Sequence, residues 1–124
     1  MVSEHDQQKA LFQWADYYKS KYPALDYMFA VPNGGLRNIA VAKKLKAEGL
    51  KAGVPDVYLD YAVNPYHGLR IELKNIKYGK KAGKPTEPQK RYINYYNENN
   101  YCALVCWGWK EASEVIVNYL EGVM

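Results

Sequence analysis

Residues Gly53–Asn75 read GVPDVYLDYAVNPYHGLRIELKN and contain two hydrophobic segments joined by a turn-prone NPYHG sequence. In the second segment Arg70, Glu72 and Lys74 alternate with apolar residues, and a period of two places these three on one face of a strand. Pro and Gly in the connection predict that the two strands pair. Asp56 opens the first strand, so pairing is expected to bring it near Glu72 and Lys74. The stretch therefore predicts a pair of adjacent strands that carry a charged cluster on one face.

The rest of the chain alternates helices with strands around this pair. Ser3 with Asp6, and Thr86 with Gln89, have capping-box spacing and predict two helix starts. The expected helices span residues 3–21, 37–49, 86–99 and 110–120, and the expected strands span 27–32, 56–63, 69–75 and 101–107. The order α-β-α-β-β-α-β-α predicts an α/β fold, a mixed sheet flanked by helices, in one domain over residues 1–124.

The composition favours a packed cytoplasmic protein. Hydrophobic residues make up 48% of the chain, which excludes a disordered class, and the apolar runs are too short to cross a membrane. The acidic, amphipathic N-terminus is unlike a secretory signal. Cys102 and Cys106 lie in an apolar run far from other metal-ligand types, so they are expected to be buried thiols. His5 and His67 match no nucleophile pattern and are expected at the surface.

A metal ion is one explanation for carboxylates that converge on one point. Asp56 and Glu72 would repel each other unless a positive charge lies between them. Oxygen ligands favour a hard cation, Mg²⁺ or Mn²⁺, to which Leu73 could add its backbone carbonyl. Lys74 would then lie one step away, where it could hold a water or offset charge on phosphorus. The alternative is an exposed cross-strand ion pair that contributes little to stability.

Basic residues concentrate in residues 37–51 and 74–91. The second run is rich in Gly and Pro, so it is expected to form a mobile basic loop that suits a phosphate backbone, although a merely solvated loop fits the charge equally well. Glycines 34 and 35 could admit DNA closely or form a plain turn, and Tyr92, Tyr95 and Tyr96 could stack on bases or pack into the core. The candidate DNA-binding residues are Asn33, Arg37, Lys77, Lys80, Lys81 and Lys84.

The order of motifs resembles a known nuclease family. Gly53-Val54-Pro55-Asp56 is followed, after fifteen residues, by Glu72-Leu73-Lys74, and then by Gln89 in a later helix. Together with PNGG, KAEGLKAGVPD and PTEPQKRY, this arrangement is similar to the VRR-Nuc (virus-type replication-repair) family of the PD-(D/E)XK nucleases. The resemblance covers nearly the whole chain and implies a restriction-endonuclease-like fold with metal-dependent hydrolysis of DNA.

The resemblance also implies roles for individual residues. Asp56 and Glu72 would be metal ligands and Lys74 the catalytic lysine. Gln89 matches a glutamine of the family's site; it could instead cap the helix with Thr86, and the two roles are expected to compete. Glu4 matches a glutamate of the N-terminal helix, a further ligand or a residue favoured there by the helix dipole.

The predicted function is therefore that of an Mg²⁺-dependent endonuclease. The resemblance to Holliday-junction resolvases implies branched DNA as substrate, a homodimer, and a bacterial or phage-infected cell. Two other interpretations remain open from the sequence. One is a non-catalytic DNA-binding module that relies on the basic loop. The other is a flap or RNA nuclease that uses the same site on a different substrate.

Overall fold

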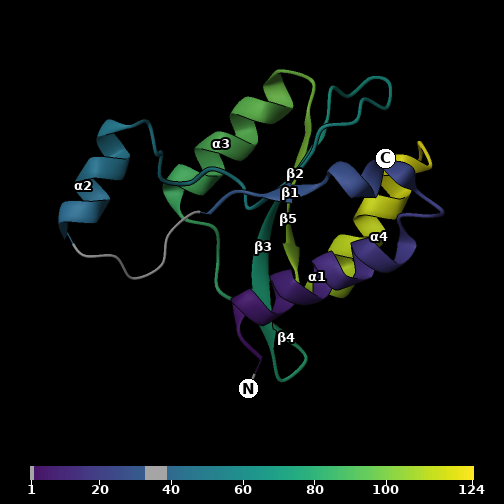
Figure 1. Cartoon of the computed structure of the whole chain (residues 1–124), viewed down its shortest axis with the longest axis horizontal. Coiled ribbons are helices and arrows are strands. Elements are labelled where there is room, and N and C mark those ends of the chain that lie inside the picture. The colour runs from purple at the N-terminus through teal and green to yellow at the C-terminus, as the bar shows by residue number, and fades with distance from the viewer. Residues whose placement is uncertain (1, 33–38) are drawn as a thin grey trace.

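The computed structural model describes residues 2–32 and 39–124, and its centre is the strand β3 (Leu69–Lys77). β3 pairs antiparallel with β2 (Val57–Leu59) and with β4 (Lys80–Ala82), and parallel with β5 (Cys102–Trp107). The short strand β1 (Phe29–Ala30) pairs antiparallel with β2 at one edge. The result is the mixed sheet that the sequence predicts (Figure 1).

Helices cover β3, so all of its residues from Leu69 to Asn75 are buried. The helices α1 (Glu4–Tyr18) and α4 (Trp109–Leu120) pack together and against β3, and Leu11 and Ile116 join Ile71 in the main hydrophobic core. The helix α3 (Glu87–Glu98) packs against β5 and β3. Burial of this many apolar side chains supplies the main stabilising free energy of the fold.

The predicted helix starts are confirmed. Ser3 and Asp6 exchange hydrogen bonds of 2.9 and 3.1 Å in a capping box at the start of α1. Thr86 and Gln89 do the same at the start of α3, with bonds of 2.8 and 3.3 Å. Each pair satisfies backbone N–H groups that a helix terminus leaves free, which is why such a local signal is reliable.

The strands on the β2 side are shorter than predicted. The segment expected as strand 27–32 begins as the end of a 3-10 helix, η1 (Pro23–Tyr27), and only Phe29–Ala30 pairs with β2. Pro23 favours the first turn of η1, and η1 ends at Tyr27, the first residue of the predicted strand. Likewise β2 ends at Leu59, well before residue 63.

The expectation of a mobile basic loop over residues 74–91 is wrong in its first half. β3 continues to Lys77 and turns back through Tyr78 and Gly79 into β4, which the sequence analysis missed. Both turn residues have positive φ, 53° and 73°, as a two-residue hairpin turn requires. The sequence signal for this turn is the pair Tyr78-Gly79 between Lys77 and Lys80, because glycine readily adopts the positive φ that the turn needs. We call residues 75–83 the basic hairpin.

The predicted helix 37–49 corresponds to α2 (Ile39–Ala47), which has no buried residue and stands apart from the sheet in Figure 1. The candidates Asn33 and Arg37, with glycines 34 and 35, lie outside the described residues. No helix within residues 2–32 and 39–124 is long and apolar enough to cross a membrane. Cys102 and Cys106 are free and buried, and His5 and His67 are exposed, as predicted.

Candidate active site

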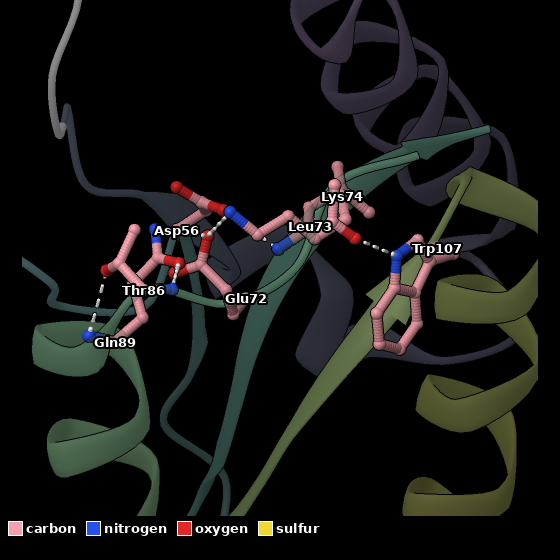
Figure 2. A network of polar contacts seen from close by, with 8 residues as sticks. Asp56, Glu72, Leu73, Lys74, Thr86, Gln89 and Trp107 are labelled. Carbon is pink, nitrogen blue, oxygen red and sulfur yellow. Dashed lines mark hydrogen bonds and ion pairs between the residues drawn. The ribbon is translucent and has the colours of Figure 1, made fainter. Parts of the chain in front are cut away.

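Asp56 lies directly before β2 and is fixed by its own backbone. Its N–H donates to the carbonyl of Ile71 at 3.0 Å, and its carbonyl accepts from the N–H of Val31 at 2.8 Å. Its Oδ2 accepts from the N–H of Leu73 at 2.8 Å. Pro55, fully buried, restricts the backbone in front of it. Asp56 is therefore held against the β3 residues that the sequence predicted as its neighbours (Figure 2).

Three carboxylates meet at this point. Oxygen atoms of Glu4, Asp56 and Glu72 all lie within 4.8 Å of one another. Glu4 comes from the first turn of α1, Asp56 from the start of β2 and Glu72 from β3. Three distant parts of the chain thus deliver like charges to one place, an arrangement that is unfavourable without a cation.

Glu72 carries most of this electrostatic cost. The residue is 1% exposed, and burial, reinforced by the neighbouring Asp56 carboxylate, raises the pKa of Glu72 to about 9. Lys74 acts in the opposite direction and lowers it. Within the described part of the chain, Oε1 of Glu72 has no hydrogen-bond partner. A buried oxygen without a partner is costly, and this one belongs to a carboxylate that meets two further carboxylates, which fits the donor set of a hard divalent cation.

The pKa of Glu4 is shifted in the same direction as that of Glu72, but by less. Burial raises the pKa of the Glu4 carboxyl, the charge of Asp56 adds to this, and Lys74 opposes it. The role that family resemblance implied for Glu4, beside the carboxylates, therefore has the right geometry. A helix-start residue placed only by the dipole would not need to approach Asp56 and Glu72.

Lys74 lies beside Glu72 with its Nζ 3.8 Å from Oε2. Lys74 is 9% exposed and Glu72 is 1% exposed. This pair is therefore not the exposed ion pair that the sequence left open as an alternative. The Lys74 carbonyl accepts from the N–H of Gly108 at 2.8 Å, which ties this point of β3 to the end of β5. The ammonium group is thus presented next to the carboxylates from a rigid backbone.

Gln89 makes both of the contacts that were expected to compete, the capping bond and a bond to the carboxylate cluster. Its Oε1 accepts from the N–H of Thr86 at 2.8 Å, while its Nε2 donates to Oε2 of Glu72 at 3.2 Å. The two ends of one amide are chemically different, so one can close the capping box while the other holds the carboxylate. Figure 2 shows this bridge from the start of α3 to β3.

Gly53 fixes the distance between α3 and the segment before Asp56. Its φ is +91°, and a Cβ there would lie 2.5 Å from the backbone carbon of Pro88. Only glycine allows the two backbones to approach this closely without strain. The approach places the start of α3, and with it Gln89, next to the carboxylates.

Arg70 is a site neighbour whose role the sequence analysis did not identify. It is 6% exposed, and its guanidinium carbon lies 4.2, 5.1 and 4.7 Å from the ring centroids of Tyr58, Tyr96 and Tyr101. Its Nη1 also donates to Asp60 at 2.7 Å. Arg70 is therefore a structural cation, enclosed by rings and one carboxylate. We call these five residues the arginine box. Tyr96 belongs to it, whereas Tyr95 is 61% exposed.

The basic hairpin is anchored to β5. The indole Nε1 of Trp107 donates to the carbonyl of Gly83 at 3.2 Å, and the Nζ of Lys81 lies 4.2 Å from the Trp107 ring centroid. Lys77, Lys80, Lys81 and Lys84 are all exposed on or beside this hairpin. Trp107 pairs in register with Lys74, so the hairpin lies next to the candidate catalytic lysine.

Comparison with known proteins agrees with this geometry. A solved structure described as "VRR_NUC domain protein" superposes on this chain with a TM-score of 0.80 and 31% sequence identity, covering 98% of this chain and 90% of the other. The chain belongs to the VRR-Nuc family. No family model and no curated protein matches the sequence. The α/β fold and the family resemblance predicted from the motif order are thus both confirmed in this VRR-Nuc chain.

Proposed function

We propose that this VRR-Nuc chain is a metal-dependent endonuclease that hydrolyses phosphodiester bonds in DNA. One observation carries the proposal: carboxylate oxygens of Glu4, Asp56 and Glu72 lie within 4.8 Å of one another, and an oxygen of Glu72 is buried there without a partner. A purely structural cluster would be expected to satisfy that oxygen. The VRR-Nuc family supplies the reaction class, and the lysine beside the cluster fits it.

The residues that would hold the cation are Asp56, Glu72 and Glu4, with the Leu73 carbonyl as a fourth donor. In an extended strand the N–H and C=O of one residue face the same side, and the Leu73 N–H faces Asp56. These are oxygen donors alone, so Mg²⁺ is the expected ion and Mn²⁺ its substitute. When bound, such an ion polarises a phosphoryl oxygen and makes water a better nucleophile at neutral pH.

The protein's own groups position the reactants. Lys74, held beside Glu72, would orient the attacking water and offset the negative charge that develops on the phosphate. Gln89 donates to Oε2 of Glu72 and so fixes the orientation of this carboxylate. Oε1, the other oxygen, is left without a hydrogen bond and could bind the cation. The water oxygen bonds to phosphorus as the bond from phosphorus to the leaving oxygen breaks, and the products are a phosphate monoester and a free hydroxyl.

We infer that the enzyme selects DNA by shape, with a four-way junction as the expected substrate and a homodimer as the active form. Exposed lysines of the basic hairpin suit backbone contacts, which carry no sequence information. A junction has twofold symmetry, and a twofold dimer would present two sites to it. The buried free thiols are consistent with work in a reducing cytoplasm, bacterial or phage-infected.

The test is cleavage of labelled DNA in the presence of Mg²⁺, Mn²⁺, Ca²⁺ or EDTA. The panel contains a four-way junction, a flap, nicked and linear duplexes and a single strand, with an RNA counterpart. We expect cutting that requires Mg²⁺ or Mn²⁺ and falls at least about a thousandfold in Asp56→Ala and Lys74→Ala, since each removes a group at the reacting phosphate. Paired symmetric nicks would support the resolvase assignment.

DNA binding without cutting in any metal, unchanged by Asp56→Ala, would instead indicate a binding module. Cleavage of the flap or the RNA in preference to the junction would support the assigned catalytic residues but show that the four-way junction is not the preferred substrate. Lys21→Ala serves as the matched control for Lys74→Ala, because Lys21 is an exposed lysine beyond the other end of α1.

A further inference from the structure

A cavity of about 390 Å³, lined by both polar and apolar residues, opens beside the carboxylate cluster, between the N-terminal segment and the basic hairpin. Its volume is within the range of roughly 300–1,000 Å³ that small-ligand sites occupy. Glu4 lines this cavity and also contributes a carboxylate to the cluster, so the two are neighbours that share this residue. The remaining lining residues are Val2, Ser3, Asn75, Lys77, Ala82 and Gly83. We call it the hairpin cavity.

One wall of the hairpin cavity is fixed by a buried amide. Asn75 is 6% exposed, and its Nδ2 donates to the carbonyl of Val2 at 2.9 Å. Its Oδ1 accepts from the N–H of Ile76 at 2.9 Å. The Oδ1 bond fixes the orientation of the amide within β3, and the Nδ2 bond holds the N-terminal segment against β3. Without that bond, the segment in front of α1 would have one hydrogen bond fewer to keep it there.

The opposite wall is fixed from the outside. Gly83 accepts a hydrogen bond from the Trp107 indole, and Lys81 lies over the same ring. Neither Trp107 nor Lys81 lines the hairpin cavity, so their contacts restrain the hairpin without filling the space. Both walls are thus preorganised, which lowers the entropic cost of binding a ligand there.

The chemistry of the lining points to a sugar–phosphate unit. Lys77 is the one cation among the lining residues, and it forms no ion pair with any residue that the structure describes. Val2 and Ala82 provide apolar surface for a sugar ring. Glu4, the one acidic member, is directed to the carboxylate cluster, where a cation would neutralise it. A lysine that lines the cavity and forms no ion pair with a described residue suits one phosphate.

We infer that the hairpin cavity receives the nucleotide adjacent to the scissile phosphate, and that Lys77 contacts the phosphate of that nucleotide. The inference rests on the proposed function for the identity of the scissile phosphate, but the Lys77 contact itself is a matter of binding. Because Glu4 belongs to both the cavity and the carboxylate cluster, a nucleotide in the cavity would lie next to the reacting one. The contact fixes the position of the strand and reads no base.

The first experiment measures DNA binding in EDTA, where no cleavage occurs. Lys77→Ala, Lys21→Ala and wild type are compared on a four-way junction and a linear duplex across a range of salt concentrations. Loss of one phosphate contact is expected to reduce the slope of log K against log salt by about 0.9 for Lys77→Ala and to leave the slope of Lys21→Ala unchanged. Equal slopes for all three proteins would overturn the inference.

The second experiment locates the contact. Single methylphosphonates, which remove one negative charge, are placed at each phosphate flanking the cleavage site, and Mg²⁺-dependent cleavage is measured. We expect one flanking position to slow wild type about tenfold while leaving Lys77→Ala no slower than on unmodified DNA. Sensitivity of Lys77→Ala at every position, as in wild type, would overturn the assignment.

The two proposals fail differently. If wild type binds DNA but does not cut it, and Lys77→Ala has a reduced salt slope, the proposed nuclease activity is overturned and the Lys77 phosphate contact is supported. If wild type cuts DNA in a metal-dependent manner and Lys77→Ala has no effect in either experiment, the nuclease activity is supported and the Lys77 contact is overturned. No binding of DNA by wild type would overturn both.

Discussion

Replacing Glu72 by glutamine is expected to stabilise the metal-free protein, in a manner that depends on pH. The folded chain holds a proton on Glu72 up to a pKa of about 9, whereas an unfolded glutamate releases it near the ordinary value of 4.5. The unfolded state therefore binds fewer protons between these values, and the free energy of unfolding of wild type falls as pH rises through this window. Glutamine is neutral throughout and avoids this loss.

The magnitude follows from the size of the window. Each pH unit corresponds to about 1.4 kcal/mol, so moving from pH 5 to pH 8 costs wild type roughly 4 kcal/mol that Glu72→Gln retains. The substitution should also preserve shape, because Gln89 can still bond to the new amide and Asp56 can accept from it. At pH 5, we expect the two proteins to differ by about 1 kcal/mol or less.

Urea unfolding at pH 5, 6.5 and 8 in EDTA measures the difference directly. Glu48→Gln is the matched control, because it removes one exposed carboxylate at the end of α2, and its free energy of unfolding should follow that of wild type at each pH. Addition of Mg²⁺ at pH 8 should stabilise wild type and leave Glu72→Gln largely unchanged, since a ligand stabilises the state that binds it. A Glu72→Gln protein that is less stable than wild type at pH 8, or whose advantage is equal at pH 5 and pH 8, would refute this account.

Two further substitutions test how the site is built. Gly53→Ala should lower the free energy of unfolding by at least about 1–2 kcal/mol more than Gly49→Ala, because both have positive φ but only Gly53 faces another backbone within 4 Å; equal losses in thermal unfolding would argue against the close approach. Gln89→Glu should keep the capping box, and so change thermal stability by less than about 1 kcal/mol in acid. It should nevertheless lower kcat at least tenfold, because it places a further carboxylate against Glu72 where the amide now donates. Unchanged cleavage by Gln89→Glu would show that the amide does not position Glu72.

The sequence predicted what local chemistry determines. Both capping boxes depend on residues three apart, and the strand carrying Glu72 depends on alternation over a few residues, so both were predictable. The basic hairpin was missed because glycines and lysines were taken as signs of a loop, although Tyr78–Gly79 carried a turn signal.

Other parts of the site depend on contacts between distant segments and could not be predicted. Arg70 was noted only as one member of an alternating strand, since its aromatic neighbours Tyr96 and Tyr101 come from other elements. The double use of Gln89 follows from the position of α3 against β3, which a capping pattern does not contain. Nor does spacing alone show that the cluster would be buried, which is what distinguishes it from a surface ion pair.

The arginine box has a consequence for the linker between β2 and β3. A slip of β3 by one residue would turn Arg70 to the opposite face, and a slip by two would replace it with Glu72 among three tyrosine rings. The arginine box therefore adds to the β2–β3 ladder in fixing the alignment of Glu72 with Asp56. An inserted peptide or reporter tag in the connection over residues 60–68 should affect the site little if it keeps the bond of Asp60 to Arg70. It must also leave in place the Tyr61 carbonyl, which accepts from Tyr119, and the core contacts of Val63 and Tyr66.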